Sequence, residues 1–448
     1  MHGRLAYEPR LIQREAHTLD NIEKVVVEGL CTGCGTCVGV CPTEAIAMHI
    51  SKGLFLPNVD LDKCTFCRLC IKCCPGCSLD FRKFNSEIFG KQPKDHKVGN
   101  YINCYVGYSN NKEIRFDSSS GGIATQLLVF ALEKGIIDGA LVTRMRKDSP
   151  LEPAPFIART KEDIISASKS KYCPVPLNEA LKCIIKEKGK FAVVGLPCHI
   201  HGIRKAEMNV KALKEKIVLH IGIMCSHTVG FSGTELLLEK AGISSEEVSE
   251  IAYRGKGWPG SMLVKLKNGS SFSVPYVGGW TAYGPIFSSF FFTPARCLMC
   301  PDETNELADI SLGDAWLPEL KNDKNGQSIV VARTKNGEDI LNLACDAGVV
   351  FLKPVGREKV RETQREPLKF KKDDLEIRLA LIKHSGMKTP EFDPKPNSSR
   401  SFFAFARNLF VFLNVKLSEK QIFKHLLRGV PLPIFRIYCG IYKFLCLL

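Results

Sequence analysis

Residues 31–42 read CTGCGTCVGVCP, and residues 64–75 read CTFCRLCIKCCP. Both segments follow the pattern C-x2-C-x2-C-x3-C-P, and the second begins 33 positions after the first. Three cysteines with two residues between neighbours let one loop bind three corners of an iron–sulfur cubane. The fourth cysteine, one helical turn later, binds the other cluster. The spacing therefore predicts two [4Fe–4S] clusters.

The repeated pattern assigns the ligands crosswise between the two segments. One cluster is predicted to bind Cys31, Cys34, Cys37 and Cys74, and the other Cys64, Cys67, Cys70 and Cys41. Zinc is the alternative, because it also binds C-x2-C pairs, but this longer repeated spacing is typical of ferredoxins. We interpret Cys73 and Cys77 as non-ligands. The fold predicted for residues 21–85 is an α+β ferredoxin-like 2[4Fe–4S] domain, preceded by a tail over residues 1–20.

The composition restricts the class of protein. The chain has 448 residues, a formal net charge of +15 and 20 cysteines, ten of them between Cys31 and Cys77. Residues 1–20 lack the apolar core of a secretory signal, so the cysteines indicate metal binding in a reducing cytoplasm rather than disulfides. The basic excess favours an acidic partner or the inner face of a membrane. We expect no nucleic-acid binding, since no motif for it is present.

The pattern changes to α/β after a polar linker over residues 86–100. An amphipathic helix is expected from residue 123 to Gly135 and another over residues 178–190. Apolar runs predict strands at the ranges 139–145, 191–197 and 216–225. Helices alternating with apolar strands predict an α/β domain with a mixed sheet. We divide it into residues 101–180 and 181–350.

The C-terminal part differs in composition. Residues 351–400 are charged and are interpreted as a connector. Residues 401–448 are aromatic, apolar and basic, but charges interrupt them before the roughly 20 apolar residues that a spanning helix needs. They predict amphipathic helices. This helical tail either lies at a membrane interface or docks on the protein's own core or on a partner subunit.

Five further segments carry a resemblance that covers about 240 residues. They are DSSSGGIATQLL (117–128), SKYCPVP (170–176), FAVVGLPCHIHGIRK (191–205), YRGKGWPG (253–260) and CLMCPDETNELADISLGDAW (297–316). In this order they resemble the beta-subunit family of coenzyme F420 hydrogenases and dehydrogenases, which includes 7-hydroxymethyl chlorophyll a reductase. The resemblance implies one bound FAD and hydride exchange with reduced coenzyme F420 as substrate.

Candidate flavin-binding residues lie in three of these segments. Ser118, Ser119, Ser120, Gly121 and Gly122 precede a helix, whose free N–H groups and dipole favour a phosphate; the alternative is a plain serine cap. Lys171 and Tyr172 are expected beside the flavin ring, where a cation stabilises reduced flavin. Without the resemblance, a Lys-Tyr pair of this kind is more often simply part of the protein surface. Candidates for a coenzyme tail or the far side of the flavin are Arg254, Lys256 and Trp258, although a glycine-rich turn explains them equally well.

A third [4Fe–4S] cluster is expected near the flavin. Cys297 and Cys300 form a C-x2-C pair, and Cys198 and Cys225 each end a predicted strand. The alternative is that Cys198 and Cys225 are ordinary buried thiols. Other residues are expected in structural roles only: His199, His201, His227, Asp302, Asp309, Asp314, Cys104, Cys173, Cys183, Cys345, Cys439 and Cys446.

These features predict an iron–sulfur flavoprotein oxidoreductase. A hydride carries two electrons and a cluster accepts one, so FAD is the adapter between them. The expected reaction exchanges hydride between F420, or a similar donor, and FAD, while single electrons pass through the clusters to a redox partner protein or ferredoxin. One alternative is a ferredoxin-coupled flavin reductase of another organic substrate, in surface polysaccharide synthesis. Another is a non-catalytic electron-relay subunit. No catalytic acid is assigned.

Overall fold

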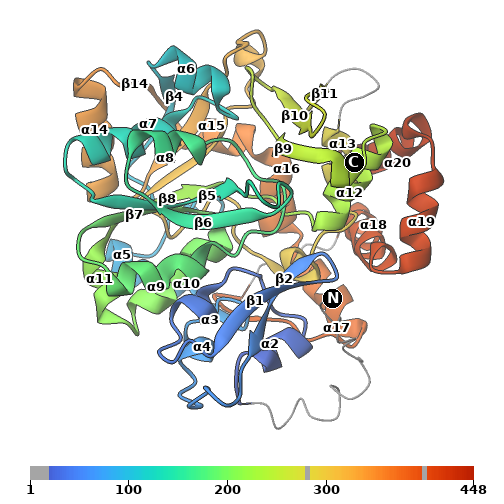
Figure 1. Ribbon diagram of the computed structural model, residues 1–448, viewed down its shortest axis with the longest axis horizontal. Coiled ribbons are helices and arrows are strands. Elements are labelled where there is room, and N and C mark those ends of the chain that lie inside the picture. The colour runs from blue at the N-terminus through green and yellow to red at the C-terminus, as the bar shows by residue number, and fades with distance from the viewer. Residues whose placement is uncertain (1–19, 278–282, 396–400, 448) are drawn as a thin grey trace.

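The computed structural model describes residues 20–277, 283–395 and 401–447 (Figure 1). The tail expected over residues 1–20 lies outside these ranges except for Asp20. The side chains of Cys439 and Cys446 also lie outside the described part of the structure.

The cysteine-rich segments fold into short helices around one hairpin. The elements are α2 (Glu23–Val27), α3 (Thr36–Gly39), β1 (Ile46–Ser51), β2 (Leu54–Val59), α4 (Leu69–Lys72), β3 (Ser78–Asp80) and α5 (Phe81–Phe89). β1 and β2 pair antiparallel. Each cysteine motif contains a four-residue helix that follows a left-handed residue, Gly35 with φ 80° and Arg68 with φ 61°. The two motifs are therefore alike in backbone as well as in sequence.

An eight-stranded mixed sheet forms the centre of the larger domain, as expected. Its strand order is β14 (Val350–Val355), β4 (Asn103–Ser109), β13 (Ser328–Ala332), β12 (Ile310–Asp314), β8 (Ile217–Ile223), β7 (Phe191–Gly195), β5 (Gly139–Met145) and β6 (Pro153–Ala158). The four strands β12, β8, β7 and β5 run parallel, and the pairings on either side of them are antiparallel. The carboxyl ends of these four strands therefore meet at one edge.

Helices cover both faces of this sheet (Figure 1). One face carries α7 (Ile123–Glu133), α8 (Lys161–Ser166) and α14 (Lys335–Asp346), and the other carries η1 (Leu177–Ala180), α9 (Leu181–Lys186), α10 (Pro197–Glu207) and α11 (Lys211–Lys216). Leu79 and Phe81 of the ferredoxin domain belong to the apolar core of the second face. The cluster-binding domain is thus packed directly against the larger one.

A separate three-stranded sheet accompanies the main sheet of the larger domain. It consists of β9 (Val248–Ala252), β10 (Ser261–Leu266) and β11 (Ser271–Pro275), in the order β11-β10-β9. The short elements around it and along the remaining loops are α6 (Lys112–Asp117), α12 (Phe231–Lys240), η2 (Ser245–Glu247), α13 (Gly284–Ser289), η3 (Ala295–Met299) and η4 (Pro318–Leu320).

The segment interpreted as a charged connector is largely helical and packed. It forms α15 (Arg357–Thr363), α16 (Arg365–Leu368), the π-helix η5 (Lys369–Asp373), α17 (Leu375–His384) and β15 (Glu391–Asp393), which pairs parallel with β3. Lys371, Asp374 and Arg378 are buried. These charges face partners inside the molecule, so the segment is part of the packed fold as well as a connector.

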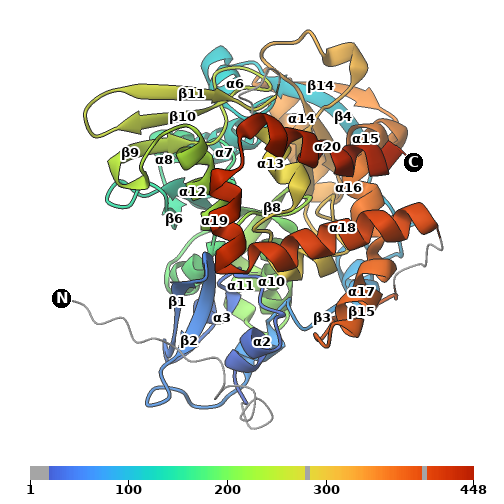
Figure 2. The same ribbon diagram turned by 90° about the vertical axis from the view of Figure 1, so that its right-hand side faces the viewer.

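The C-terminal helices α18 (Phe402–Ser418), α19 (Gln421–Gly429) and α20 (Leu432–Leu447) lie on one side of the molecule (Figure 2). Arg407 on α18 donates to Asp374 Oδ2 through Nη2 at 2.7 Å and Nε at 2.9 Å, and both residues are buried. The helices are thereby docked on the protein's own core. Within the described ranges, no helix is both long and apolar enough to cross a membrane.

Candidate functional site

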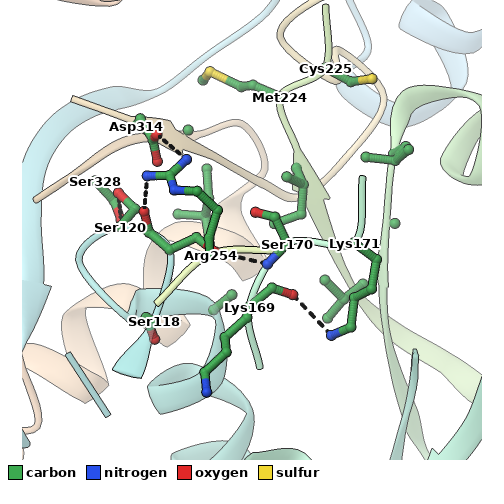
Figure 3. Close-up of a pocket in the computed structure, with 18 of the residues that line it drawn as sticks. Ser118, Ser120, Lys169, Ser170, Lys171, Met224, Cys225, Arg254, Asp314 and Ser328 are labelled. Carbon is green, nitrogen blue, oxygen red and sulfur yellow. Dashed lines mark hydrogen bonds and ion pairs between the residues drawn. The ribbon is translucent and has the colours of Figure 1, made fainter. Parts of the chain in front are cut away.

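A cavity of about 410 Å³ opens at the carboxyl ends of the parallel strands. Its wall includes Gly195 at the end of β7, Ile223 at the end of β8 and Asp314 at the end of β12. In open α/β sheets, ligands bind at this edge. Cys225 and most of the predicted flavin residues line the same space (Figure 3), namely Ser118, Ser119, Ser120, Gly122, Lys171, Tyr172 and Arg254.

The serine–glycine loop forms one wall of the cavity, at the start of α7. Gly122 is the N-cap of α7 with φ 76°, and no side chain caps the helix. The first N–H groups of a helix have no acceptor within it, and residues 123–125 line the cavity. The plain serine cap is therefore not the arrangement observed, and this helix end can receive an anionic group.

Close backbone packing holds this loop in place. Gly121 N donates to Ser328 Oγ at 3.0 Å, and Ser120 Oγ donates to the Gln327 carbonyl at 2.8 Å. A Cβ at Gly121 would lie 2.6 Å from the Gly107 carbonyl oxygen, so only glycine fits there. Gly121 itself lies behind the cavity wall.

Arg254 connects three parts of the wall. Its Nη1 donates to the Tyr172 hydroxyl at 3.0 Å and to Asp314 Oδ2 at 3.1 Å, and its Nη2 donates to the Ser119 carbonyl. Figure 3 shows the side chain directed toward Asp314. Its buried Nε has no hydrogen-bond partner within the described chain. This unpaired donor in a cavity wall fits an anionic or carbonyl-bearing ligand.

Lys171 and Tyr172 also line the cavity, but their roles differ. The Lys171 ammonium donates to the carbonyls of Ala167, Ser168 and Lys169, so it holds the loop after α8 rather than standing free. Burial lowers the pKa of Lys171 to about 7. The Tyr172 ring stacks on Tyr276 at 6.1 Å between centroids.

Lys256 and Trp258 lie outside the cavity wall. Lys256 is half exposed and pairs with Asp117 at 3.0 Å, and Trp258 is buried against Trp316 at 4.5 Å between ring centroids. Trp316 does line the cavity. Trp316 is the last residue of the segment 297–316, in which the cysteines and aspartates carry the sequence signal and a single tryptophan does not.

Glu303 is a second cavity residue that the sequence did not reveal. Its Oε2 is buried and has no hydrogen-bond partner in the described part of the molecule. Burial raises the pKa of this carboxyl to about 8. The site thus contains one acid that stays protonated near neutrality. Its only sequence signal was its position three residues after Cys300.

The four thiols assigned to the first cluster lie together. Burial raises the pKa of Cys31, Cys34 and Cys37, and the neighbouring Cys74 thiolate raises each further. Cys74 belongs to the second motif, so the structure brings together the crosswise set. In the other set, burial raises the pKa of Cys70 to about 11, and nearby Cys67 and Cys41 contribute to the rise.

The two extra cysteines differ from each other. Cys73 is fully buried among apolar residues that include Val40 and Leu79. The Cys77 sulfur, in contrast, lies in hydrogen-bond contact with that of Cys74, which lowers the pKa of Cys77. Cys77 is therefore a direct neighbour of an expected ligand, as the C-x2-C spacing of Cys74 and Cys77 also allows.

The four thiols assigned to the third cluster also lie together. Cys198 lies in the first turn of α10, Cys225 follows β8, and Cys297 and Cys300 lie in and after η3. Burial raises the pKa of Cys198, and neighbouring thiolates, among them those of the other three, raise it further. The buried ammonium of Lys371 adjoins this group and donates to the Cys297 carbonyl at 3.3 Å. A buried cation beside four thiols fits an anionic cluster.

The distances between the described thiols do not suit the binding of a single metal ion. Across residues 20–277, 283–395 and 401–447, no three Cys, His, Asp or Glu side chains are close enough to hold one metal ion. Sulfurs bound to one zinc would lie about 3.8 Å apart, given a Zn–S bond of about 2.3 Å. A cubane bound at its corners separates them more widely.

The histidines and aspartates near these groups have protein partners. His199 bonds the Leu196 N–H and the Val175 carbonyl, and burial lowers its pKa to about 4. Asp302 accepts from His201 Nε2 at 2.8 Å and from the N–H groups of Asn305 and Glu306. His227, which lines the cavity, stacks on Phe290 and bonds the Ser226 hydroxyl through Nδ1 at 3.1 Å, but its buried Nε2 has no hydrogen-bond partner among the described residues.

A cluster-binding domain packed against a mixed sheet with a cavity lined by a cysteine defines an iron–sulfur oxidoreductase. Family models match in the same order: a 4Fe–4S dicluster domain over residues 30–76, and the N-terminal and C-terminal parts of the coenzyme F420 hydrogenase/dehydrogenase beta subunit over residues 104–182 and 188–358. The chain belongs to the coenzyme F420 hydrogenase/dehydrogenase beta-subunit family.

Relatives of known name agree with this assignment. The coenzyme F420 hydrogenase beta subunit of Methanothermobacter thermautotrophicus is 31% identical over 301 residues, 65% of this chain and 99% of the relative. The coenzyme F420-dependent sulfite reductase of Methanocaldococcus jannaschii is 28% identical over 373 residues, 80% of this chain but only 52% of that relative. A chain of the F420-reducing [NiFe] hydrogenase complex from Methanosarcina barkeri superposes with a TM-score of 0.53 and 27% identity, covering 67% of this chain and 98% of that one.

Proposed function

We propose that this oxidoreductase binds FAD in the 410 Å³ cavity and exchanges hydride between that flavin and reduced coenzyme F420, or a similar donor. Single electrons then pass through three [4Fe–4S] clusters to a redox partner protein. Bound FAD would supply the conversion between two-electron and one-electron transfer. The named relatives, a hydrogenase subunit and a sulfite reductase that use coenzyme F420, support the choice of donor.

The residues of the cavity have separate roles in this proposal. The uncapped start of α7 receives a phosphate of the cofactor. Arg254 fixes the serine loop through the Ser119 carbonyl and offers its unpaired Nε to the ligand. Tyr172 and Trp316 provide flat apolar surface for the ring system. Eighteen cysteines with described side chains are all free thiols, which suits a reducing cytoplasm.

The observation that carries the proposal is the continuity of the thiol groups. Cys225 lines the cavity and belongs to the third group. Cys198 of that group adjoins Cys34 of the first cluster, and Cys37 of the first cluster adjoins Cys70 of the second. Cys67 in the second group is exposed. In this proposal, single electrons would pass along this series of thiol groups from the cavity to the surface.

Anaerobic mixing with reduced F420 tests the function. We expect rapid bleaching of the flavin absorbance, followed by reduction of the clusters. Cys225→Ser should leave the bleaching intact but slow cluster reduction. Bleaching by reduced ferredoxin alone would favour the ferredoxin-coupled reductase of another substrate. Clusters without any flavin would favour the electron-relay subunit.

A further inference from the structure

The C-terminal helices expose an unusual amount of apolar surface. Ten of the twenty-two exposed large apolar side chains in the described chain lie on α18, α19 and α20. On α20, the exposed residues Ile434, Ile437, Ile441 and Phe444 recur at intervals of three and four, which places them along one stripe. Ile422 on α19 is 78% exposed. Contiguous apolar surface of this kind marks a binding face.

This outer face is distinct from the face that packs on the protein. Ala404, Val411 and Val415 point inward on α18 and are buried, and Leu427 is buried on α19. Figure 2 shows all three helices on the same side of the molecule. The inner faces of these helices thus already pack on the protein's own core, and the exposed apolar residues are available to an external partner.

The charge of the segment indicates what that partner is. Residues 401–448 contain seven Lys and Arg and a single acid, Glu419. Three of the cations, Arg407, Arg428 and Lys416, pair with acids of this chain, whereas Lys420 is exposed close to the apolar Ile422. Protein interfaces combine an apolar centre with a rim of mixed polar groups, whereas helices that lie on anionic bilayers combine bulky apolar residues with Lys and Arg. No helix among the described residues can cross a membrane.

We propose that the outer face of α18, α19 and α20 binds the surface of an anionic lipid membrane. Ile422 and Leu426 insert below the headgroups, and Lys420, which is exposed at the start of α19, contacts lipid phosphates. The redox domains then remain on the water side, attached through the Arg407–Asp374 pair.

Cosedimentation of the full-length, cluster-loaded protein with vesicles tests this proposal. We expect at least tenfold stronger binding to phosphatidylglycerol vesicles than to phosphatidylcholine vesicles, weakened by high salt. The double variant Ile422→Glu and Leu426→Glu should lose at least tenfold in binding. Leu343→Glu, at a 52% exposed position on α14, is the matched control and should bind normally.

Circular dichroism and iron content verify that each variant is folded. The proposal is overturned if the wild type fails to bind anionic vesicles, or if the double variant binds as well as the wild type. It is equally overturned if the wild type dimerises through this face and the double variant is monomeric, because the occupant would then be a second copy of the chain.

Discussion

Arg254 Nη1 lies 3.1 Å from Asp314 Oδ2, and this ion pair joins the loop after β9 to the last residue of β12. It closes the cavity wall between the small sheet and the main sheet. The same guanidinium holds the Ser119 carbonyl. One buried side chain therefore sets the position of both the serine loop and the strand end that the proposed flavin would contact.

Arg254→Gln should lose FAD. A hydrogen bond to a charged group contributes about 1.5–3 kcal/mol, so losing one or more of them should weaken FAD binding at least about tenfold. The measurement is the flavin-to-protein ratio after gel filtration, followed by titration with FAD. Lys256→Gln removes a neighbouring charge outside the cavity wall and serves as the control. Equal flavin retention in the two variants would contradict the assigned role of Arg254.

Cys74→Ser should remove one cluster, and Cys73→Ser should remove none. At four irons per cubane, three clusters give about twelve irons per chain, and the first variant should fall to about eight. Cys73 is buried among apolar side chains, so its hydroxyl replacement affects stability rather than iron. Iron quantitation on anaerobically reconstituted protein measures both. Iron loss in Cys73→Ser alone would show that the crosswise assignment is wrong.

Lys171 should make the stability of the apoprotein depend on pH. Burial lowers its pKa from 10.5 to about 7, so between these pH values the unfolded chain binds a proton that the folded chain does not. Stability rises with pH wherever the unfolded state binds more protons. We therefore expect the contribution of Lys171 to raise Tm from pH 7 toward pH 10. Lys171→Met should flatten this rise, whatever its effect on Tm at a single pH. An unchanged slope would refute the prediction.

Arg407→Met should destabilise the fold and detach α18. It leaves the buried carboxylate of Asp374 without its cation, and breaking such a pair costs about 3–5 kcal/mol. The comparison is Lys335→Met, which breaks an exposed i,i+4 pair with Asp339 and should change stability far less, because water screens such a pair. Urea unfolding measures both free energies. Similar small losses would mean that the C-terminal helices are held mainly by apolar packing.

The sequence by itself determined the cluster motifs and much of the central sheet. The cysteine spacing lies within two short segments of the sequence. It therefore predicts the loops that bind each cubane without any information on how the domains pack. The strand expected over residues 139–145 is β5, and the helix expected from residue 123 is α7. Both contain long apolar runs and are buried over most of their length in the same core, and such runs can be recognised in the sequence.

Only the tertiary structure decided which distant groups share the site. Lys371 comes from the segment that was interpreted as a charged connector, and the fold buries its ammonium beside Cys297. Trp258 was expected at the cofactor and lies behind the wall, where it packs on Trp316, the residue that does face the cavity. Local sequence encodes backbone conformation and apolar periodicity, whereas the choice between facing a ligand and supporting the wall depends on packing between segments far apart in the chain.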